Sequence, residues 1–328
     1  MKQTTLRLEQ PHFDGIGAQF HRIISAYAIS RKLNIPLAYD PITDFDNQIF
    51  EANKLSLDKW NSLIEVMVPN SLEQLMPQTM EISHRSQRLL PLLFNIAKTH
   101  RSNRSVVHVI NSPHTITNKY PSFLENLSFP KIQEPTHLTS ANRRALQIVL
   151  HIRRGELGLS QFKNRYLPLK YFERVLSEII PKLEFYGIPY EVTIPVEPGQ
   201  DRILNASDAR VIASLSLERN NPNLIQVSKK GFKIVYENPD LKTTPFLMKA
   251  KWVESGDAWV DFLRFLHADI FVMSKSSLSY VAAILNGDRE VVCPQFWHPK
   301  LRPWLGKEDL RQWNPVSFYN EIERGKMK

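Results

Sequence analysis

Residues 4–39 read TTLRLEQPHFDGIGAQFHRIISAYAISRKLNIPLAY, and this opening decides the fold class. Leu6 and Leu8 alternate with polar neighbours, which is the period of a β-strand. After the loop, the apolar residues of 18–33 fall at helical spacing and define one face of an amphipathic helix. Pro36 ends that pattern, and the apolar residues 37–39 predict a second strand. Strand, helix and strand in this order predict a βαβ unit and therefore a parallel sheet.

The alternation of strands and helices restarts near residue 145. ALQIVLHI at 145–152 and DIFVM at 269–273 predict buried strands, while residues 171–185 and 277–285 predict helices. Residues 55–100 are expected to be mostly helical, and the later half of the Pro-, Ser-, Thr- and Asn-rich stretch 112–142 is expected to link two domains. Because 328 residues exceed the usual size of one core, we predict two doubly wound α/β domains, residues 1–140 and 141–328, that face a central cleft.

Composition and charge narrow the class of protein. Cys293 is the only cysteine, so no intrachain disulfide can form, which is typical of a reducing compartment. The first ten residues lack the apolar run of a signal peptide, and no stretch approaches the ~20 apolar residues of a membrane span. We therefore expect a cytoplasmic protein without a transmembrane segment, for which peripheral membrane contact stays open. The net charge of +9 comes from scattered basic residues rather than from a stripe, which argues against a nucleic-acid partner.

The segment IVLHIRRGE, residues 148–156, carries the most chemical information. A buried strand runs directly into Arg153, Arg154 and Gly155. A guanidinium group makes paired, charge-assisted hydrogen bonds to phosphate oxygens, and the carboxyl end of a parallel strand faces the crevice where ligands bind. The two arginines therefore indicate a diphosphate site. A surface arginine pair beside a turn glycine is the alternative from residue type alone.

A phosphohistidine enzyme is a second interpretation of this segment. RRGE differs by one residue from RHGE, the signature of histidine phosphatases and phosphoglycerate mutases, in which the histidine accepts the phosphoryl group. Arg154 occupies that position here and cannot serve as the nucleophile. His151 lies three positions upstream on the predicted strand and does not replace the missing group. The substitution therefore argues against this class.

A short Ser/Lys loop follows the predicted strand 269–273 and opens a helix. Ser274, Ser276 and Ser277 stand near the first backbone N–H groups of that helix, which attract an anion, and small hydroxyl side chains let a phosphate approach. An ordinary serine N-cap is the alternative. The spacing of this loop is not that of a Walker loop.

The loop from Asp14 to Gln19 joins the first predicted strand to the first helix. Gly15 and Gly17 permit close backbone approach by a ligand, but the third glycine of a dinucleotide-binding loop is missing. A tight turn required by the βαβ unit is the alternative. Metal binding is not indicated, because the ten histidines form no ligand-like cluster and no Asp-x-Asp triplet is present to hold Mg²⁺ or Mn²⁺.

Taken in order, GIGAQ, HIRRGE and SKSSLSYVAA resemble the motifs of the GDP-fucose transferase superfamily. This group includes the α1,2- and α1,6-fucosyltransferases and the protein O-fucosyltransferases. The likeness extends from residue 13 to about residue 300, and the middle motif is the most specific. Three departures from the family pattern are present: Ala18 replaces asparagine, Glu156 replaces aspartate, and Tyr280 stands where an aromatic pair is usual.

The resemblance implies a GT-B fold, with two Rossmann-like domains and the nucleotide held by the C-terminal one. It implies a metal-independent, inverting glycosyltransferase that moves a sugar, with fucose from GDP-fucose as the expected donor, onto a glycan hydroxyl; no other cofactor is expected. It places Arg153 on the diphosphate, where the guanidinium compensates charge as GDP departs. The other residues that it places at the donor site are His151, Arg154, Gly15, Gly17, Gln19, Ser274, Ser276, Ser277 and, for reading guanine, Asp269 in preference to Asp257 and Asp261.

Glu156 and Asp14 are the two candidates for the general base that deprotonates the acceptor hydroxyl. The alternatives are that Glu156 only orients an arginine and that Asp14 only caps the following helix. Three other functions stay open: a transferase for another nucleotide sugar, a non-catalytic nucleotide- or carbohydrate-binding protein of the same fold and, least supported, a nucleic-acid-binding protein. Four aromatic residues fit either sugar stacking or core packing: Phe296, Trp297, Trp304 and Trp313.

Overall fold

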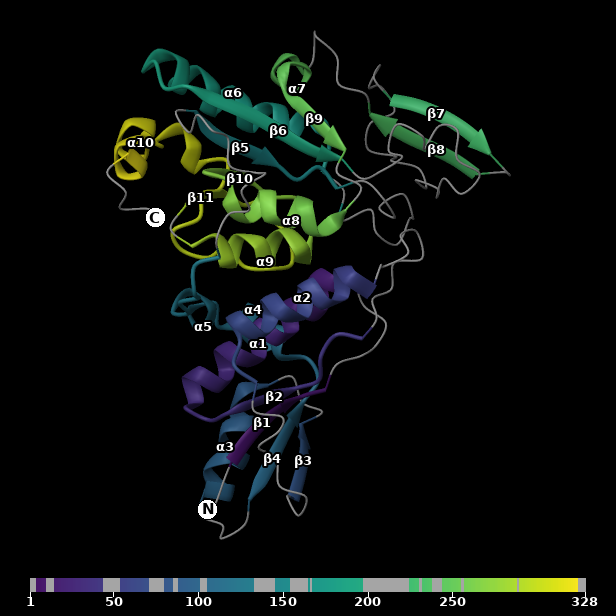
Figure 1. Cartoon of the computed structure of the whole chain (residues 1–328), viewed down its shortest axis with the longest axis vertical. Helices are drawn as coiled ribbons and strands as arrows, with labels where there is room; N and C mark the ends of the chain where they lie inside the picture. Colours follow the sequence, from purple (N-terminus) through teal and green to yellow (C-terminus); the bar gives the residue numbers. More distant parts are fainter. Residues whose placement is uncertain are drawn as a thin grey trace. The chain divides into compact units, whose positions relative to one another are not determined.

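The computed structural model describes residues 4–9, 15–43, 54–70, 80–84, 88–100, 105–132, 145–153, 165, 167–196, 224–229, 232–237, 244–254, 257–287 and 289–323. The chain divides into two compact units, shown in Figure 1. Unit 1 comprises residues 1–132 together with 297–302, and unit 2 comprises residues 133–296 and 303–328. Each unit contains a parallel sheet with helices, so the predicted α/β class is confirmed. The predicted boundary between residues 140 and 141 lies outside the described residues and stays a prediction.

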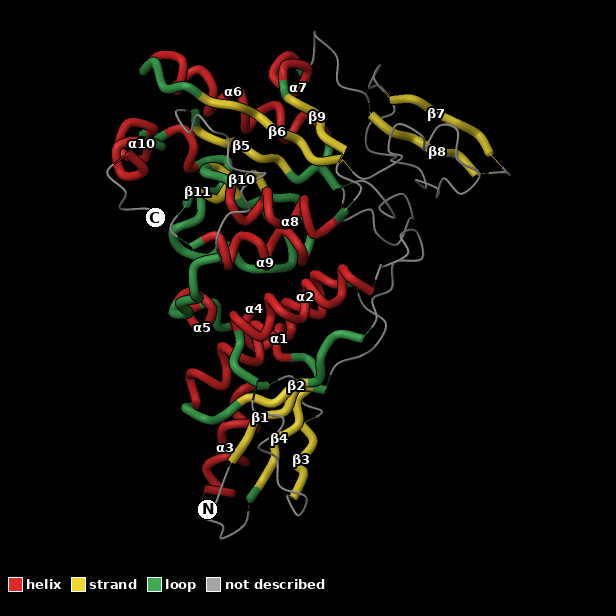
Figure 2. The backbone as a smooth tube through the Cα atoms, in the orientation of Figure 1, coloured by secondary structure: helices red, strands yellow, loops and turns green. Residues whose placement is uncertain are grey.

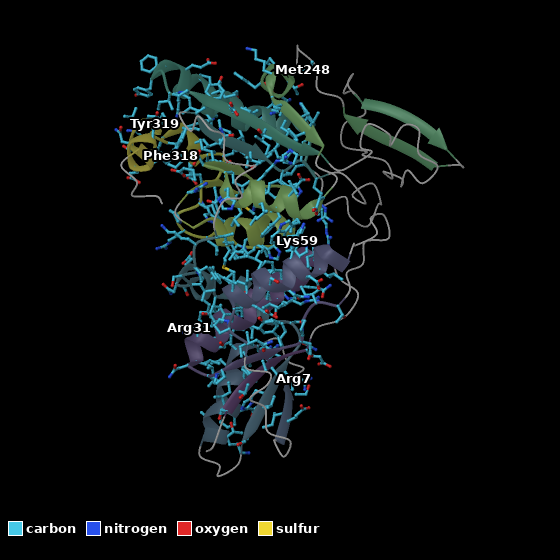
Figure 3. The ribbon with its side chains drawn as sticks, viewed as in Figure 1. Arg7, Arg31, Lys59, Met248, Phe318 and Tyr319 are labelled. Atoms are coloured by element: carbon cyan, nitrogen blue, oxygen red, sulfur yellow. The ribbon has the colours of Figure 1, made fainter. Side chains whose placement is uncertain are left out.

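The described sheet of unit 1 has the strand order β2-β1-β4-β3 (Figure 2). All its pairs are parallel. Its strands are β1 (Thr4–Leu8), β2 (Leu37–Tyr39), β3 (Met80–His84) and β4 (Val106–Ile110). Leu6 and Leu8 are buried, as their alternation predicts, and pair with Leu37 and Tyr39. Arg7, labelled in Figure 3, points from the other face of β1 and forms a solvent-exposed ion pair that contributes little to stability.

The helices of unit 1 are α1 (Ile16–Leu33), α2 (Lys54–Met67), α3 (Leu89–His100), α4 (Pro113–Lys119) and α5 (Ser122–Glu125). Helix α1 buries Phe20, Ile23 and Ile24, and it ends at Asn34, whose left-handed backbone (φ 53°) closes the helix. One detail differs from the expectation, because strand β3 lies inside the stretch 55–100. Helices α4 and α5 form in the first half of the proline-rich stretch, where Pro113 and Pro121 stand at helix starts, a place at which proline is tolerated.

The parallel sheet of unit 2 has the strand order β11-β10-β5-β6-β9 in the described residues. Its strands are β5 (Leu146–Leu150), β6 (Tyr190–Val196), β9 (Lys251–Glu254), β10 (Ile270–Val272) and β11 (Glu290–Val292). The chain builds outward from β5 through β6 to β9, and then crosses to β10 and β11 on the other side of β5. Since parallel crossovers are right-handed, this reversal places helices on both faces of the sheet, which is a doubly wound arrangement.

The packing of β10 shows that both faces are covered. Ile270 and Val272 belong to the buried core that contains Phe172 of helix α6 (Leu169–Phe185). Phe271 between them stacks on Phe265 of helix α8 (Ala258–His267), with ring centroids 5.1 Å apart. Figure 1 shows α6 on one side of this sheet and α8 with α9 (Ser277–Asn286) on the other.

Unit 2 contains further elements. Strands β7 (Leu224–Lys229) and β8 (Phe232–Glu237) form a separate antiparallel hairpin. Helix α7 (Pro245–Lys249) precedes β9, and the 3₁₀ turn η5 (Asp309–Arg311) precedes α10 (Pro315–Glu323). These last three, α7, η5 and α10, contribute residues to the same core as the sheet and α6. Phe318 of α10, labelled in Figure 3, is buried beside Trp313. Among the described residues, none of the helices combines the length and the apolar character that crossing a membrane needs.

Candidate functional site

The candidate site of unit 2 lies at the carboxyl ends of the neighbouring strands β5 and β10. These two strands flank the topological switch point, because the chain continues from β5 to β6 on one side and from β10 to β11 on the other. In doubly wound sheets, ligands bind in the crevice outside this point. Arg153 follows β5 and residues 274–276 follow β10, so the structure brings the two predicted phosphate-binding segments together.

Arg153 contacts the start of helix α9. Its Nη1 donates to the Ser276 hydroxyl at 3.2 Å. Ser276 is the N-cap of the helix, and its hydroxyl oxygen also accepts from the backbone N–H of Leu278 at 3.2 Å. Ser277 is the first residue of α9. The guanidinium therefore lies beside the positive end of a helix, a place that favours a negative charge.

His151 is buried behind these groups. Its ring stacks on Phe265 of α8, with centroids 4.6 Å apart and an interplanar angle of 22°. Its Nδ1 contacts the hydroxyl of Ser279 and lies 3.3 Å from the hydroxyl of Ser274. Burial, followed by the charge of Arg153, lowers the pKa of His151 to about 3. The imidazole is therefore neutral at pH 7 and acts on the loop rather than on an anion.

A second set of hydrogen bonds fixes the loop between β10 and α9. The Ser279 hydroxyl accepts from the Ser274 N–H at 3.3 Å and lies 3.2 Å from the Ser274 hydroxyl. The N–H of Ser276 donates to the carbonyl of Ser274 at 2.9 Å. Lys275 stands between them, and burial lowers the pKa of its ammonium group. Ser279 was not predicted, although it follows the N-cap Ser276 by three residues, a spacing that places these two serines on one face of α9.

Asp269 lies at the opposite edge of the sheet from Arg153. It precedes β10, where its carboxylate accepts from the N–H of Gln147 at 2.9 Å and lies 3.7 Å from Nη1 of Arg289. A residue before a parallel strand belongs to the amino edge, whereas the switch-point crevice opens at the carboxyl edge. The expectation that Asp269 sits near the phosphate loop is therefore wrong, and its contacts are those of a structural carboxylate.

Asp257, unlike Asp269, lies at the carboxyl edge of the sheet. It is the N-cap of α8, where its Oδ1 accepts from the N–H of Trp259 at 2.8 Å. Because α8 follows β9 and leads to the amino end of β10, the start of α8 lies at the carboxyl edge of the sheet. Asp261, one turn further along, is bonded to Arg264 at 3.0 Å. Of the three aspartates considered for guanine, Asp257 is the one that caps a helix at the carboxyl edge of the sheet.

Gly15, Gly17 and Gln19 belong to unit 1, at the start of α1. Gly15 is the N-cap position, with an extended backbone (φ −61°, ψ 152°), and its carbonyl accepts from the N–H groups of Ala18 and Gln19 at 2.9 and 3.1 Å. Among the described residues, no atom lies within 4 Å of a Cβ placed at Gly15, so neither the backbone angle nor packing against them requires glycine there. Gly17 and Gln19 are buried, the latter with 2% exposure.

Three predicted site residues, Asp14, Arg154 and Glu156, lie outside the described residues. Their roles as general bases or as a diphosphate ligand therefore stay predictions. Within the described part of the chain, His, Cys, Asp and Glu side chains form no group of three or more that suits a metal ion.

A cluster of three histidines in unit 1, of which His21 and His298 are buried, was not predicted. The ring centroid of His21 on α1 lies 4.4 Å from that of His298 and 6.1 Å from that of His114 on α4. His298 accepts at Nε2 from the Trp297 indole at 2.9 Å, so its Nδ1 carries the proton and donates to Asn118 at 3.1 Å. Burial, followed by the charge of His298, lowers the pKa of His21 well below its usual value. The imidazole of His21 is thus an uncharged packing group at pH 7.

No protein-family model matches the chain. No curated protein sequence matches it either. Among solved structures, Escherichia coli heptosyltransferase WaaC with ADP-2-deoxy-2-fluoro heptose is similar over 98% of this chain and 100% of its own, with 12% identity and a TM-score of 0.36. The fucosyltransferase NodZ from Bradyrhizobium is similar over 87% of this chain and 93% of its own, with 10% identity and a TM-score of 0.32. A glycosyl transferase of family 9 from Veillonella parvula covers 100% of this chain and 93% of its own, with 10% identity and a TM-score of 0.39. These sequence identities and TM-scores are too low to assign a ligand or a reaction to this chain.

Proposed function

We propose that the chain is a glycosyltransferase that binds a nucleotide-diphosphate sugar at the Arg153 cluster of unit 2. The observation that carries the proposal is the guanidinium of Arg153 beside the N-terminus of α9. Both groups are positive, so together they attract an anion. A diphosphate supplies that charge, and it also accepts the paired hydrogen bonds that arginine offers.

The proposed chemistry is displacement at the anomeric carbon of the donor sugar. An acceptor hydroxyl forms the new C–O bond, the bond from the anomeric carbon to the β-phosphate oxygen breaks, and the nucleoside diphosphate leaves with that electron pair. Negative charge grows on the leaving phosphate, where Arg153 and the first N–H groups of α9 stabilise it. The hydroxyl proton goes to a carboxylate, for which Glu156 and Asp14 remain our candidates.

The buried residues of the cluster have a positioning role in this proposal. His151 and Ser279 hold Ser274 in place, and Ser274 in turn accepts the bond from the N–H of Ser276. Because the imidazole is neutral, it adds no charge to the site and serves as a fixed hydrogen-bonding partner. The hydroxyl of Ser276 is then presented to Arg153 and to the bound phosphate together.

We propose a GDP-sugar as the donor, with GDP-fucose as the first to be tested. The ordered motifs GIGAQ, HIRRGE and SKSSLSYVAA support this choice through their resemblance to the GDP-fucose transferases. In place of Asp269, we propose Asp257 for the guanine edge, since the start of α8 lies at the carboxyl edge of the sheet. A glycan hydroxyl is the proposed acceptor.

A thermal-shift titration with GDP, UDP and ADP tests the proposal. A ligand that binds only the folded state stabilises it by about 2.7 kcal/mol at a concentration one hundred times its Kd. We expect GDP to raise the unfolding temperature, and we expect Arg153→Ala to abolish both that shift and transfer from GDP-fucose. Arg174→Ala is the matched control, because Arg174 is an exposed arginine on α6 of the same unit.

Each outcome of this titration decides between the alternatives. A selective response to ADP or UDP would keep the transferase and replace the donor. A GDP shift without any donor hydrolysis or transfer would favour a non-catalytic nucleotide-binding protein. An Arg153→Ala protein that is folded and responds to GDP like the Arg174→Ala control would refute the placement of the diphosphate.

A further inference from the structure

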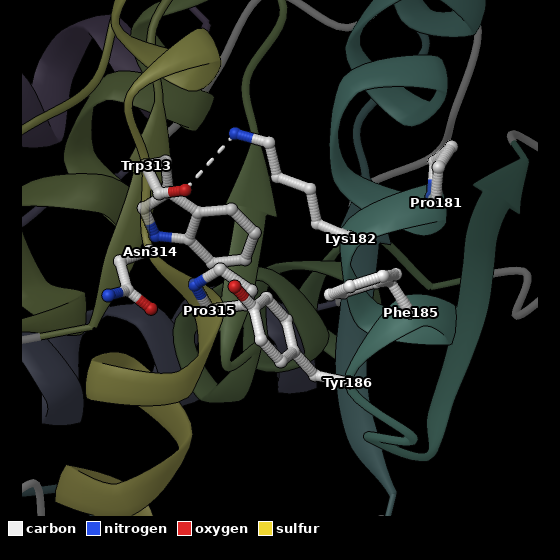
Figure 4. A pocket seen from close by; sticks show the side chains of 7 residues that line it. All are labelled: Pro181, Lys182, Phe185, Tyr186, Trp313, Asn314 and Pro315. Carbon is white, nitrogen blue, oxygen red and sulfur yellow. Dashed lines mark hydrogen bonds between the residues drawn. The ribbon is translucent and has the colours of Figure 1, made fainter.

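A cavity of about 500 Å³ opens on unit 2 between the end of α6 and the segment before α10 (Figure 4). Its walls are three aromatic rings, two prolines, a lysine and an asparagine. Its volume falls within the range of roughly 300–1,000 Å³ that is typical of small-molecule sites. The composition, aromatic with few polar groups, is also that of a ligand pocket.

The cavity lies at the amino edge of the sheet, away from the Arg153 cluster. Helix α6 starts after β5, at the carboxyl edge, and ends just before β6 begins, so Phe185 and Tyr186 at its end lie at the amino edge. On the other wall, the indole Nε1 of Trp313 donates to Oε1 of Glu290, the first residue of β11, at 3.1 Å. The cavity is therefore not part of the proposed donor site.

The aromatic rings at the end of α6 are unusually exposed. Phe185 has 81% and Tyr186 has 53% of its surface accessible, whereas large aromatic side chains are mostly buried in folded proteins. Their rings are nearly perpendicular, with centroids 5.0 Å apart and an interplanar angle of 86°. The pair lines the cavity together with Trp313. These surfaces suit a ligand with flat apolar faces.

The ammonium group of the lysine in the cavity is fully hydrogen-bonded within the protein. An ammonium group has three donors. Nζ of Lys182 donates to the carbonyls of Leu310, Arg311 and Trp313 at 2.6, 2.9 and 3.1 Å, and Figure 4 shows the last of these bonds. An anionic ligand would have to displace one of these bonds, so the cavity does not favour a negative charge.

The polar groups that remain are neutral. Asn314 accepts at Oδ1 from the N–H of Val316 at 3.0 Å, which directs its amide oxygen to the start of α10 and leaves the Nδ2 donor for a ligand. The phenol of Tyr186 both donates and accepts. A neutral molecule with C–H faces for the rings and hydroxyl groups for the amide and phenol matches this set.

We infer that this cavity binds a neutral saccharide, at a site separate from the donor site. A pyranose ring has an apolar face that stacks on an aromatic ring and a rim of hydroxyl groups that donate and accept hydrogen bonds. The inference does not require the transferase activity, because it rests on the rings, on the fully hydrogen-bonded lysine and on the neutral amide.

Ligand-observed saturation-transfer NMR on the full chain, without nucleotide, tests this inference. The probes are the methyl glycosides of galactose, glucose, fucose and N-acetylglucosamine, with methyl glucuronide as an anionic counterpart. We expect at least one neutral glycoside to bind. We expect Phe185→Ala and Tyr186→Ala each to weaken that binding by about tenfold, since the aromatic contact supplies most of the affinity. Phe94→Ala is the control, because Phe94 on α3 of unit 1 is an exposed phenylalanine with 70% accessibility.

Several results would overturn the inference. Binding of no neutral glycoside, tighter binding of the glucuronide, or equal affinity in the Phe185→Ala, Tyr186→Ala and Phe94→Ala proteins would each do so. Self-association that Phe185→Ala abolishes, without saccharide binding, would assign the rings to a protein contact instead. Since these substitutions are at exposed rings, unchanged urea midpoints verify that the variants are folded. GDP titration of the same proteins separates this outcome from the fate of the donor site.

Discussion

Replacing Ser279 with alanine tests whether the buried network behind Arg153 is as interdependent as its geometry suggests. The Ser279 side chain is fully buried. Its hydroxyl contacts Nδ1 of His151, accepts from the N–H of Ser274 at 3.3 Å and lies 3.2 Å from the Ser274 hydroxyl. Alanine removes all three contacts and leaves a space too small to repack.

The expected loss follows from the groups that remain. A buried polar group without its partner costs about 1–3 kcal/mol. Nδ1 of His151 keeps the Ser274 hydroxyl at 3.3 Å, whereas the N–H of Ser274 loses the acceptor that Ser279 supplies. We therefore expect the free energy of unfolding of unit 2 to fall by about 2 kcal/mol. We also expect GDP to bind about tenfold more weakly, because a mobile Ser274 no longer fixes the start of α9.

Hydrogen exchange in increasing urea measures this effect separately for each unit, which is necessary because a chain with two units need not unfold in one step. Peptides that cover β5 and α9 should lose protection at lower urea, and peptides from α1 should not change. Ser177→Ala is the matched control: its hydroxyl is exposed and bonds to the Arg174 carbonyl within α6, so we expect a change within about 0.5 kcal/mol. Equal stabilities of the Ser279→Ala and Ser177→Ala proteins would refute the reasoning.

Three further predictions concern stability. Asp257→Ala removes the N-cap of α8, so we expect unit 2 to lose about 1 kcal/mol in urea denaturation; an unchanged midpoint would contradict the capping role. Glu173 is buried and accepts from two N–H groups at the start of α7, each at 3.0 Å, so Glu173→Ala should cost about 1–3 kcal/mol, and hydrogen exchange of α7 should rise first. His21 and His151 have pKa values in the folded state below the usual value near 6.5, so the unfolded chain binds more protons than the folded chain as the pH falls. The free energy of unfolding should therefore fall by about 1.4 kcal/mol per histidine for each pH unit below about 6.5. Urea midpoints that stay constant from pH 7.5 to 4.5 would contradict this.

The fold was predictable where local periodicity and packing agree. Three elements could be predicted from local sequence alone. They are β1, from the alternation in Thr4–Leu8, β5, from its run of apolar residues, and α6, from its apolar face. Strand β3 was missed because Met80–His84 was assigned to the mostly helical stretch 55–100. The pairing of β7 with β8 in an antiparallel hairpin was not predicted from the sequence.

The residues of the candidate site were likewise predictable only in part. Arg153 and Ser276 were found because each follows a buried strand, and the carboxyl-edge rule brings such positions together. The same rule argues against Asp269, which precedes its strand, and in favour of Asp257. The histidine cluster had no sequence signal, because His21, His114 and His298 are far apart in the chain and meet only through tertiary packing.

Residues 297–302 make unit 1 discontinuous along the chain, and this affects the order in which it is completed during synthesis. His298 bonds to Asn118, and the N–H of Arg302 donates to Glu125 at 3.0 Å, so the segment is attached to α4 and α5. A growing chain presents its N-terminal residues first, but these contacts become available only after most of unit 2 has left the ribosome. A fragment that ends at residue 132 therefore lacks part of its own core, and the two units cannot be deleted or exchanged as consecutive blocks.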